Sequence, residues 1–163
     1  MAPNRNHLLL TESIAAKGDV TPCAGRLVDH LGNSAKPVLN LVNVEITWLL
    51  TGETEEVAEL VLKLDQVLFA HEYVAMSSDP HLAAMSTEEQ IPSVRISMVG
   101  ASGLRIGGRM RNSSLEWQRP FMVMQRPQIE LLRDDAARLA SQLQDLPYLL
   151  VNRDRIEAFF VTE

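Results

Sequence analysis

Two stretches of this chain have the same pattern, and that repetition constrains the fold more than any other feature. Residues 36–50 read KPVLNLVNVEITWLL and residues 119–132 read RPFMVMQRPQIELL, so each begins with a basic residue and a proline. Shifting the chain against itself by 83 positions aligns Gly25 with Gly108, Arg26 with Arg109, Pro37 with Pro120, Ile46 with Ile129 and Leu49 with Leu132. A repeat at about half the length predicts two copies of one unit, related by internal duplication.

The first of these stretches is typical of a long strand. Every second residue is apolar from position 42 onward, at Val42, Val44, Ile46, Trp48 and Leu50. This alternation is the pattern of a strand with one buried face. Upstream, Leu39 and Leu41 follow the opposite phase, which predicts a bulge or a sharp bend near Leu41 and Val42. In the second copy Pro127 interrupts the pattern, and because proline cannot donate a ladder hydrogen bond, we expect that strand to be broken or to lie at an edge.

The rest of each copy indicates further short strands separated by turn residues. Five strands per copy favour an all-β fold with minor α content, made of two tandem five-stranded small barrels. The exception is DDAARLASQLQD in the second copy, whose apolar residues recur at helical spacing after the candidate caps Asp134 and Asp135. We therefore expect a first barrel over residues 1–76, a linker over 77–92 with a helical turn at Asp79-Pro80, and a second barrel with one inserted short helix over 93–163.

A small barrel with a glycine in its second strand and a long bent third strand resembles the Sm-like and SH3-like group. The stretches GRLVDHLGNSAKPVLNLVNVEI and LVNRDRIEAFF are similar to an uncharacterised family of bacterial small-barrel domains. The resemblance implies a fold and leaves the activity open. The first copy departs from the Sm pattern, because LVDHLGNSAKPVLN has a longer spacing and KLDQVLFA stands where Arg-Gly is expected. RNA-binding residues are therefore not carried over.

Charge is distributed unevenly along the 163 residues, whose net charge is −6. Residues 1–83 hold 5 basic and 11 acidic residues, whereas residues 84–163 hold 10 of each, and all ten basic ones are arginine. A net negative charge disfavours non-specific binding to phosphate backbones, so DNA is not an expected partner. No apolar run approaches the roughly 20 residues that span a bilayer, so we expect a cytoplasmic protein that does not enter a membrane.

The sequence contains no pattern typical of a catalytic, metal or cofactor site. The histidines His7, His30, His71 and His81 lie in unrelated segments, and the lone Cys23 is expected to be a small structural side chain. The adjacent His71 and Glu72 are interpreted as surface residues, since neighbours on a strand face opposite ways. The glycines of VGASGLRIGG precede RMRNSSLEW, which has no helical pattern, so they indicate a hairpin rather than a phosphate loop. We expect no cofactor, no metal and no enzymatic activity.

Arginines and one tryptophan of the second copy are the candidate interaction residues. Trp117 and Arg119 lie in the segment NSSLEWQRPF, where an aromatic ring beside an arginine suits a protein interface or base stacking. The alternative is that the Trp117 ring folds over the barrel end and packs into the core. The remaining candidates are Arg109, Arg111 and Arg126, which either grip carboxylates or a partner or pair locally.

Three functions are compatible with these features. The favoured hypothesis is a non-catalytic interaction or assembly module that binds a protein partner or associates with itself through exposed strand edges. The alternative is an Sm-like RNA-binding protein, motivated by the barrel pattern and by Trp117 with Arg119. The third is a small-molecule sensor with a pocket between the two barrels, for which only the duplication argues.

Overall fold

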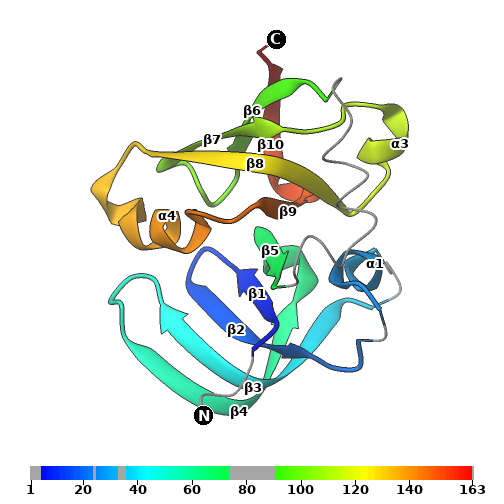
Figure 1. Ribbon diagram of the computed structural model, residues 1–163. Coiled ribbons are helices and arrows are strands. Elements are labelled where there is room, and N and C mark those ends of the chain that lie inside the picture. The colour runs from blue at the N-terminus through cyan, green and yellow to red at the C-terminus, as the bar shows by residue number, and fades with distance from the viewer. Residues whose placement is uncertain (1–4, 24, 33–35, 74–90, 163) are drawn as a thin grey trace.

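The computed structural model describes residues 5–23, 25–32, 36–73 and 91–162. These residues form one ten-stranded antiparallel sheet with three short helices (Figure 1). In Figure 1 the first half of the chain lies below the second half, and the two termini lie at opposite ends of the molecule. The predicted all-β class with minor α content is confirmed.

In the first half, residues 5–73, the described residues form five strands and one helix. The strands are β1 (His7–Leu10), β2 (Ile14–Val20), β3 (Val38–Trp48), β4 (Thr54–Lys63) and β5 (Phe69–Glu72). The short helix α1 (Leu27–Leu31) follows β2, and the 3₁₀ turn η1 (Leu64–Gln66) joins β4 to β5.

The second half, residues 91–162, contains the other five strands and two helices. The strands are β6 (Ser93–Met98), β7 (Leu104–Arg109), β8 (Phe121–Leu131), β9 (Tyr148–Asn152) and β10 (Ile156–Val161). The helices are α3 (Ser114–Trp117) and α4 (Ala137–Leu143), with the 3₁₀ turns η3 (Asp134–Ala136) and η4 (Arg153–Arg155).

The sheet runs in the order β10-β6-β7-β8-β9-β5-β1-β2-β3-β4. Each half thus pairs its own strands in the order fifth, first, second, third and fourth, and β9 pairs with β5 where the halves meet. The described strands leave β4 and β10 as edges, so the sheet is not closed and the two predicted barrels are not confirmed as closed units. Within the described residues, no helix has the length and apolar character needed to span a membrane.

The predicted bend in the long strand is present in both halves. On β3, Asn43 has a φ of 54°, and the pairing with β2 shifts register between Lys17 and Asp19. On β8, Arg126 has a φ of 50°, and the pairing with β7 shifts between Gly107 and Arg109. The two bulges lie 83 positions apart, which is the offset at which the two similar stretches of sequence align.

The expectation for Pro127 is wrong, because β8 runs unbroken past it and is not an edge strand. It pairs with β7 on one side and with β9 on the other. Pro127 follows Arg126 inside the bulge, where the register skips both residues. A bulge leaves a residue without a ladder partner, so the missing N–H of proline costs no hydrogen bond there.

Glycines on the second strand of each half make room for the bulge. A Cβ at Gly18 would lie 3.0 Å from the carbonyl oxygen of Val42, and a Cβ at Gly108 would lie 2.9 Å from that of Gln125. Gly108 therefore corresponds to Gly18. The alignment of Gly25 with Gly108 does not hold in three dimensions, because Gly25 precedes α1 with a φ of 106°.

The inserted helix is confirmed as α4, but its predicted caps are not. Asp134 and Asp135 belong to the 3₁₀ turn η3, and α4 begins after Ala136 without a side-chain cap. The helix α3, in the segment interpreted as a loop, is held by Ser113, whose hydroxyl accepts a hydrogen bond from the Glu116 N–H at 3.3 Å. Four residues are too few for a periodic pattern, so only the cap could have revealed it.

Two hydrophobic cores lie against the sheet, and each contains residues from both halves. One is built mainly by the second half but includes Leu49 and Phe69, while the other is built mainly by the first half but includes Phe121 and Tyr148. The predicted linker over 77–92, with its helical turn, lies outside the described residues except for Ile91 and Pro92. The boundaries at residues 76 and 93 stay predictions.

Candidate functional site

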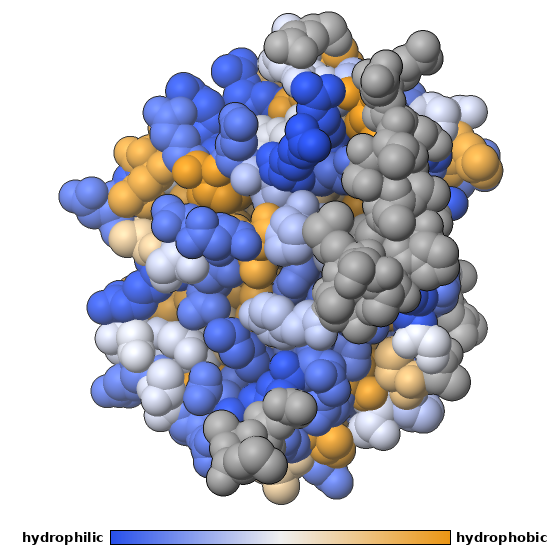
Figure 2. All heavy atoms as spheres, in the orientation of Figure 1, coloured by the Kyte–Doolittle hydropathy of each residue, from blue (hydrophilic) through white to orange (hydrophobic). Residues whose placement is uncertain are grey.

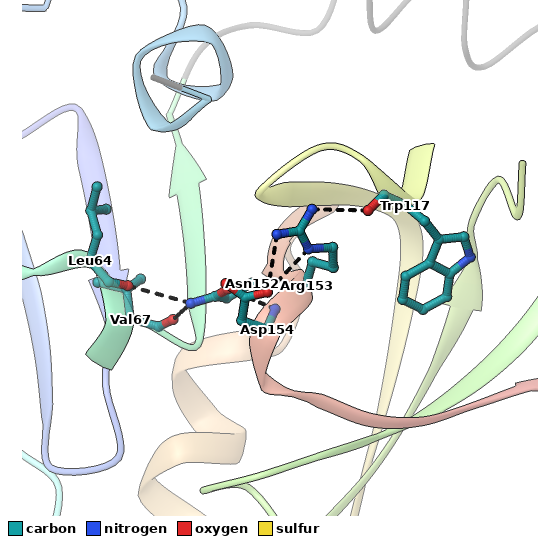
Figure 3. Close-up of polar contacts among 6 residues, drawn as sticks. All are labelled: Leu64, Val67, Trp117, Asn152, Arg153 and Asp154. Atoms are coloured by element: carbon teal, nitrogen blue, oxygen red, sulfur yellow. Dashed lines mark hydrogen bonds and ion pairs between the residues drawn. The ribbon is translucent and has the colours of Figure 1, made fainter. Parts of the chain in front are cut away.

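The junction between the halves is held by side chains as well as by strand pairing (Figure 3). The Asn152 amide donates to the carbonyl of Val67 at 2.8 Å and to that of Leu64 at 3.4 Å. The Asn152 side-chain oxygen accepts from the N–H of Asp154 at 3.1 Å, which caps η4. One asparagine thus binds the first half and starts the turn into β10.

Polar side chains are buried beside the same junction. The His71 ring lies 4.6 Å from the Tyr148 ring, and His71 Nδ1 donates to the Tyr148 carbonyl at 3.1 Å. The Tyr148 hydroxyl donates to the carbonyl of Glu72 at 3.0 Å. Burial lowers the pKa of His71 from 6.5 to about 4, so the ring is neutral at neutral pH.

The interpretation of His71 and Glu72 as surface residues is wrong, because both are buried. Glu72 accepts a hydrogen bond from the N–H of Leu27 at 2.9 Å, at the first residue of α1, and lies 3.9 Å from Arg26 Nε. The carboxylate thereby replaces the missing side-chain cap of α1. His71, Glu72 and Tyr148 therefore have a structural role, since each has a partner within the fold.

Trp117 packs into the fold instead of projecting from it. Its ring meets Phe159 edge to face at 5.2 Å and lies against the core that the second half builds. The indole Nε1 donates to Asn112 Oδ1 at 2.8 Å, and the Trp117 carbonyl accepts from Arg153 Nη1 at 3.0 Å (Figure 3). The structure thus favours the core-packing alternative for this residue.

Arg119 is separated from the other candidate arginines by its place on the loop after α3. It is paired at 3.7 Å with Glu116 and lies in an open groove of about 450 Å³. The groove is lined by Val28, Asp29 and Gly32 from around α1 and by Leu115, Gln118, Arg119, Pro120 and Phe121. Arg111, which follows β7, is half-buried.

Arg109 and Arg126 are brought together by the bulge on β8. Both line an open depression of about 410 Å³, together with Ser93, Val94, Gly107, Gly108, Gln128 and Thr162. A second depression of about 280 Å³ adjoins it, shares Val94, Gly107 and Gln128, and contains Arg95 and Arg105. We name the surface formed by Arg95, Arg105, Arg109 and Arg126 the arginine surface.

Two members of the arginine surface, Arg109 and Arg126, are among the candidate residues predicted from the sequence. Arg95 and Arg105 were missed although the predicted hairpin over VGASGLRIGG already places their strands side by side, as β6 and β7 are in the structure. Arg105 is paired with Glu130 at 3.0 Å, and the Arg95 guanidinium lies 5.2 Å from the centre of the Phe160 ring. Together with that hairpin, alternation on β6 and β7 could have placed both arginines on a solvent face.

The edge strands expose apolar side chains. On β4, Val61 is 62% exposed, and on β10, Phe160 is 45% and Val161 is 51% exposed. Elsewhere, Figure 2 shows hydrophilic residues over most of the visible face, with hydrophobic residues in separate patches. Unpaired strands with exposed apolar residues are surfaces on which another strand can be added.

Metal-binding and nucleophilic chemistry find no support in the described residues. No group of three or more His, Cys, Asp or Glu side chains there could hold a metal ion. Cys23 is half-buried, and burial raises the pKa of its thiol, which disfavours the reactive thiolate.

Searches with the chain found no matching family model, no matching curated protein and no matching solved structure.

Proposed function

We propose that this protein is a non-catalytic assembly module whose chains associate head to tail, with β4 of one chain pairing with β10 of the next. The observation that carries the proposal is the junction inside the chain. There β9, the fourth strand of the second half, pairs with β5, the fifth strand of the first half. The two edge strands are the remaining fourth and fifth strands, so the same kind of contact can be made between chains.

The correspondence between the halves supports this reading. The halves share their strand order, their bulges at Asn43 and Arg126, the close glycines Gly18 and Gly108, and a 3₁₀ turn between their last two strands. We infer that they are copies of one small-barrel unit, in keeping with the Sm-like resemblance. A contact that one copy makes with the other is then available to each free edge.

The register of the contact between chains follows from the pairings within the chain. Val61 pairs with Asn40, and Leu150 pairs with Val123, which is 40 plus 83, so Val61 corresponds to Leu150. Ala70 pairs with Leu9 on the first strand of its half, and Phe159 pairs with Ile96, so Phe159 corresponds to Ala70. Since Ala70 pairs with Leu150, the proposal places Phe159 of one chain opposite Val61 of the next.

Backbone groups of β4 are oriented for this contact. The Asn40 carbonyl accepts from the N–H of Thr21, so Asn40 directs its backbone groups toward β2 and away from β4. Its partner Val61 therefore directs its own N–H and C=O toward the free edge, by the alternation of an antiparallel ladder. Val61 is the residue that the proposed register requires to bond with the neighbouring chain.

Charge favours pairing of unlike edges. β4 carries Glu55, Glu56 and Glu59, so two β4 strands side by side would place like charges together. β10 itself carries one acid, Glu157, and Arg95 of the adjacent strand β6 lies beside Phe160. With fewer acids on the strand and an arginine beside it, β10 is a better partner for β4 than a second β4 is. A head-to-tail contact produces closed rings or open filaments, depending on the rotation between neighbours.

We expect Val61→Pro to abolish association, because proline removes the N–H that the neighbouring strand needs and breaks no bond to β3. Light scattering after size-exclusion chromatography should show multimers of the wild-type chain whose mass rises with concentration, and a monomer for Val61→Pro. The matched control is Val61→Thr, which keeps the N–H and the β-branched shape and should still associate.

The proposal fails if the wild-type chain is monomeric at high concentration. It also fails if Val61→Pro associates as the wild type does while circular dichroism shows both chains folded. The RNA-binding alternative relied on Trp117 to stack on a base, and the Trp117 ring packs against Phe159 instead. A titration with mixed single-stranded RNA at low salt tests it separately.

A further inference from the structure

The depression that contains Arg109 and Arg126 has a counterpart in the first half that is already filled. There Arg5 Nε donates to the carbonyl of Asn43 at 2.9 Å, at the bulge that corresponds to Arg126. The Arg5 guanidinium also pairs with Glu56 at 2.8 Å and with Glu45 at 3.7 Å. Its side chain is only 14% exposed, so the first half covers this place with its own cation.

In the second half the lining has the opposite charge. Arg109 stands where the first half has Asp19, Arg126 where it has Asn43, and Gln128 where it has Glu45. The position that corresponds to Arg5 is Pro92, one residue before β6, which has no side-chain group able to form an ion pair. The second half thus presents arginines at this place, whereas the first half presents acidic residues and neutralises them with Arg5.

The two guanidinium groups are available to a ligand. Within the described ranges, no carboxylate forms an ion pair with Arg109 or with Arg126. Arg109 Nη1 donates to the Ile91 carbonyl at 3.1 Å, and this bond anchors the side chain. The other N–H groups of the guanidinium can donate to a ligand. Arg126 has its backbone N–H bonded to the carbonyl of Pro147, which holds the residue at its φ of 50°.

The conformation of Arg126 is a second sign of a built site. A φ of 50° is uncommon for residues other than glycine, asparagine and aspartate, and holding it costs stability. The first half meets the same requirement with Asn43, which tolerates it. An arginine at this position directs a guanidinium to the depression at a cost in stability.

We propose that this depression binds a small polyanionic ligand through an oxyanion, a carboxylate or a phosphate, held by Arg109 and Arg126. Guanidinium groups bind both kinds of oxyanion in a bidentate manner, and Arg109 and Arg126 place two of them on the lining of one depression. Gln128 adds an amide donor to the lining of the depression. The volume of about 410 Å³ suits a small metabolite.

The test is isothermal titration calorimetry of the full chain at low ionic strength, with citrate as the carboxylate probe and pyrophosphate as the phosphate probe. We expect saturable binding of at least one probe, and the tighter one identifies the class of oxyanion. Arg109→Gln should lower the affinity about tenfold or more, the size expected for a charge-assisted hydrogen bond of about 1.5 to 3 kcal/mol.

Two further variants separate a built site from general charge and from misfolding. Arg105→Gln removes the same charge from the arginine surface but acts on a side chain already paired with Glu130, so affinity should change less than threefold. Arg126→Gly should lose binding and keep or raise the midpoint of thermal unfolding, because glycine accepts a φ of 50°. Absence of binding to both probes overturns the proposal, and so does an equal loss in Arg105→Gln and Arg109→Gln.

Discussion

His71 shows how a residue can acquire a property that its neighbours in sequence do not indicate. It lies at the end of a strand whose pairing with β9 buries it under Tyr148, 77 positions away. Alternation along a strand predicts one buried and one exposed face. At this junction both faces of β5 are covered, so the alternation does not show which residues are exposed. The alternation rule placed His71 on the surface for that reason.

Burial of His71 predicts a loss of stability in mild acid. The pKa of His71 is about 4 in the folded chain and ordinarily 6.5. Between pH 4 and pH 6.5 the unfolded chain therefore binds a proton at His71 and the folded chain does not. The contribution of neutral His71 to the free energy of unfolding is fully present above pH 6.5 and is lost as the pH falls toward 4. At pH 5 the loss amounts to about 2 kcal/mol. Urea unfolding of the wild type and of His71→Asn at pH 7.5 and pH 5 measures the effect.

Asparagine keeps a donor near the position of His71 Nδ1 but does not titrate. Its free energy of unfolding should therefore depend less on pH than that of the wild type. An equal dependence on pH in the two chains would contradict this role for His71.

At the scale of elements, the bulged long strand was the feature most visible in the sequence. The phase of the apolar residues changes beside Asn43, where the structure has the first bulge. In the second half the sequence suggested a broken or edge strand at Pro127, and the structure has a second bulge there. The close glycines could not be aligned from sequence, because the segment between the second and third strands is longer in the first half, which shifts Gly18 relative to Gly108.

Gly108→Ala should destabilise the chain by about 1 to 3 kcal/mol, as overpacking does. The added Cβ would lie 2.6 Å from Met124 Cγ and 2.9 Å from the Gln125 carbonyl oxygen, so the bulge must shift. Gly32→Ala is the matched control, since its Cβ meets nothing closer than 3.4 Å and its φ is −72°. Thermal unfolding of both variants decides the point, and similar midpoints would contradict the steric role of Gly108.

At the scale of the whole molecule, the sharing of both cores predicts that the halves unfold together. Leu49 of the first half lies in the core of the second, and Phe121 of the second lies in that of the first. We expect one cooperative transition in scanning calorimetry, although the repeat alone would suit two independent units. Leu49→Ala and Phe121→Ala, at about 2 to 5 kcal/mol each, should move that single transition without splitting it. Two resolved transitions in either variant would show that the halves are separate.

The sequence by itself determined the class of fold, the five strands of each half, the bulge and the inserted helix. These depend on local alternation, on turn residues and on the spacing of apolar side chains, all of which are read within a few positions. Only the tertiary structure decided that β9 joins β5, that Trp117 is packed and that Arg109 and Arg126 line one depression. The physical reason is that backbone hydrogen bonds are the same for every strand, so a sequence shows that a strand needs partners without showing which strands they are.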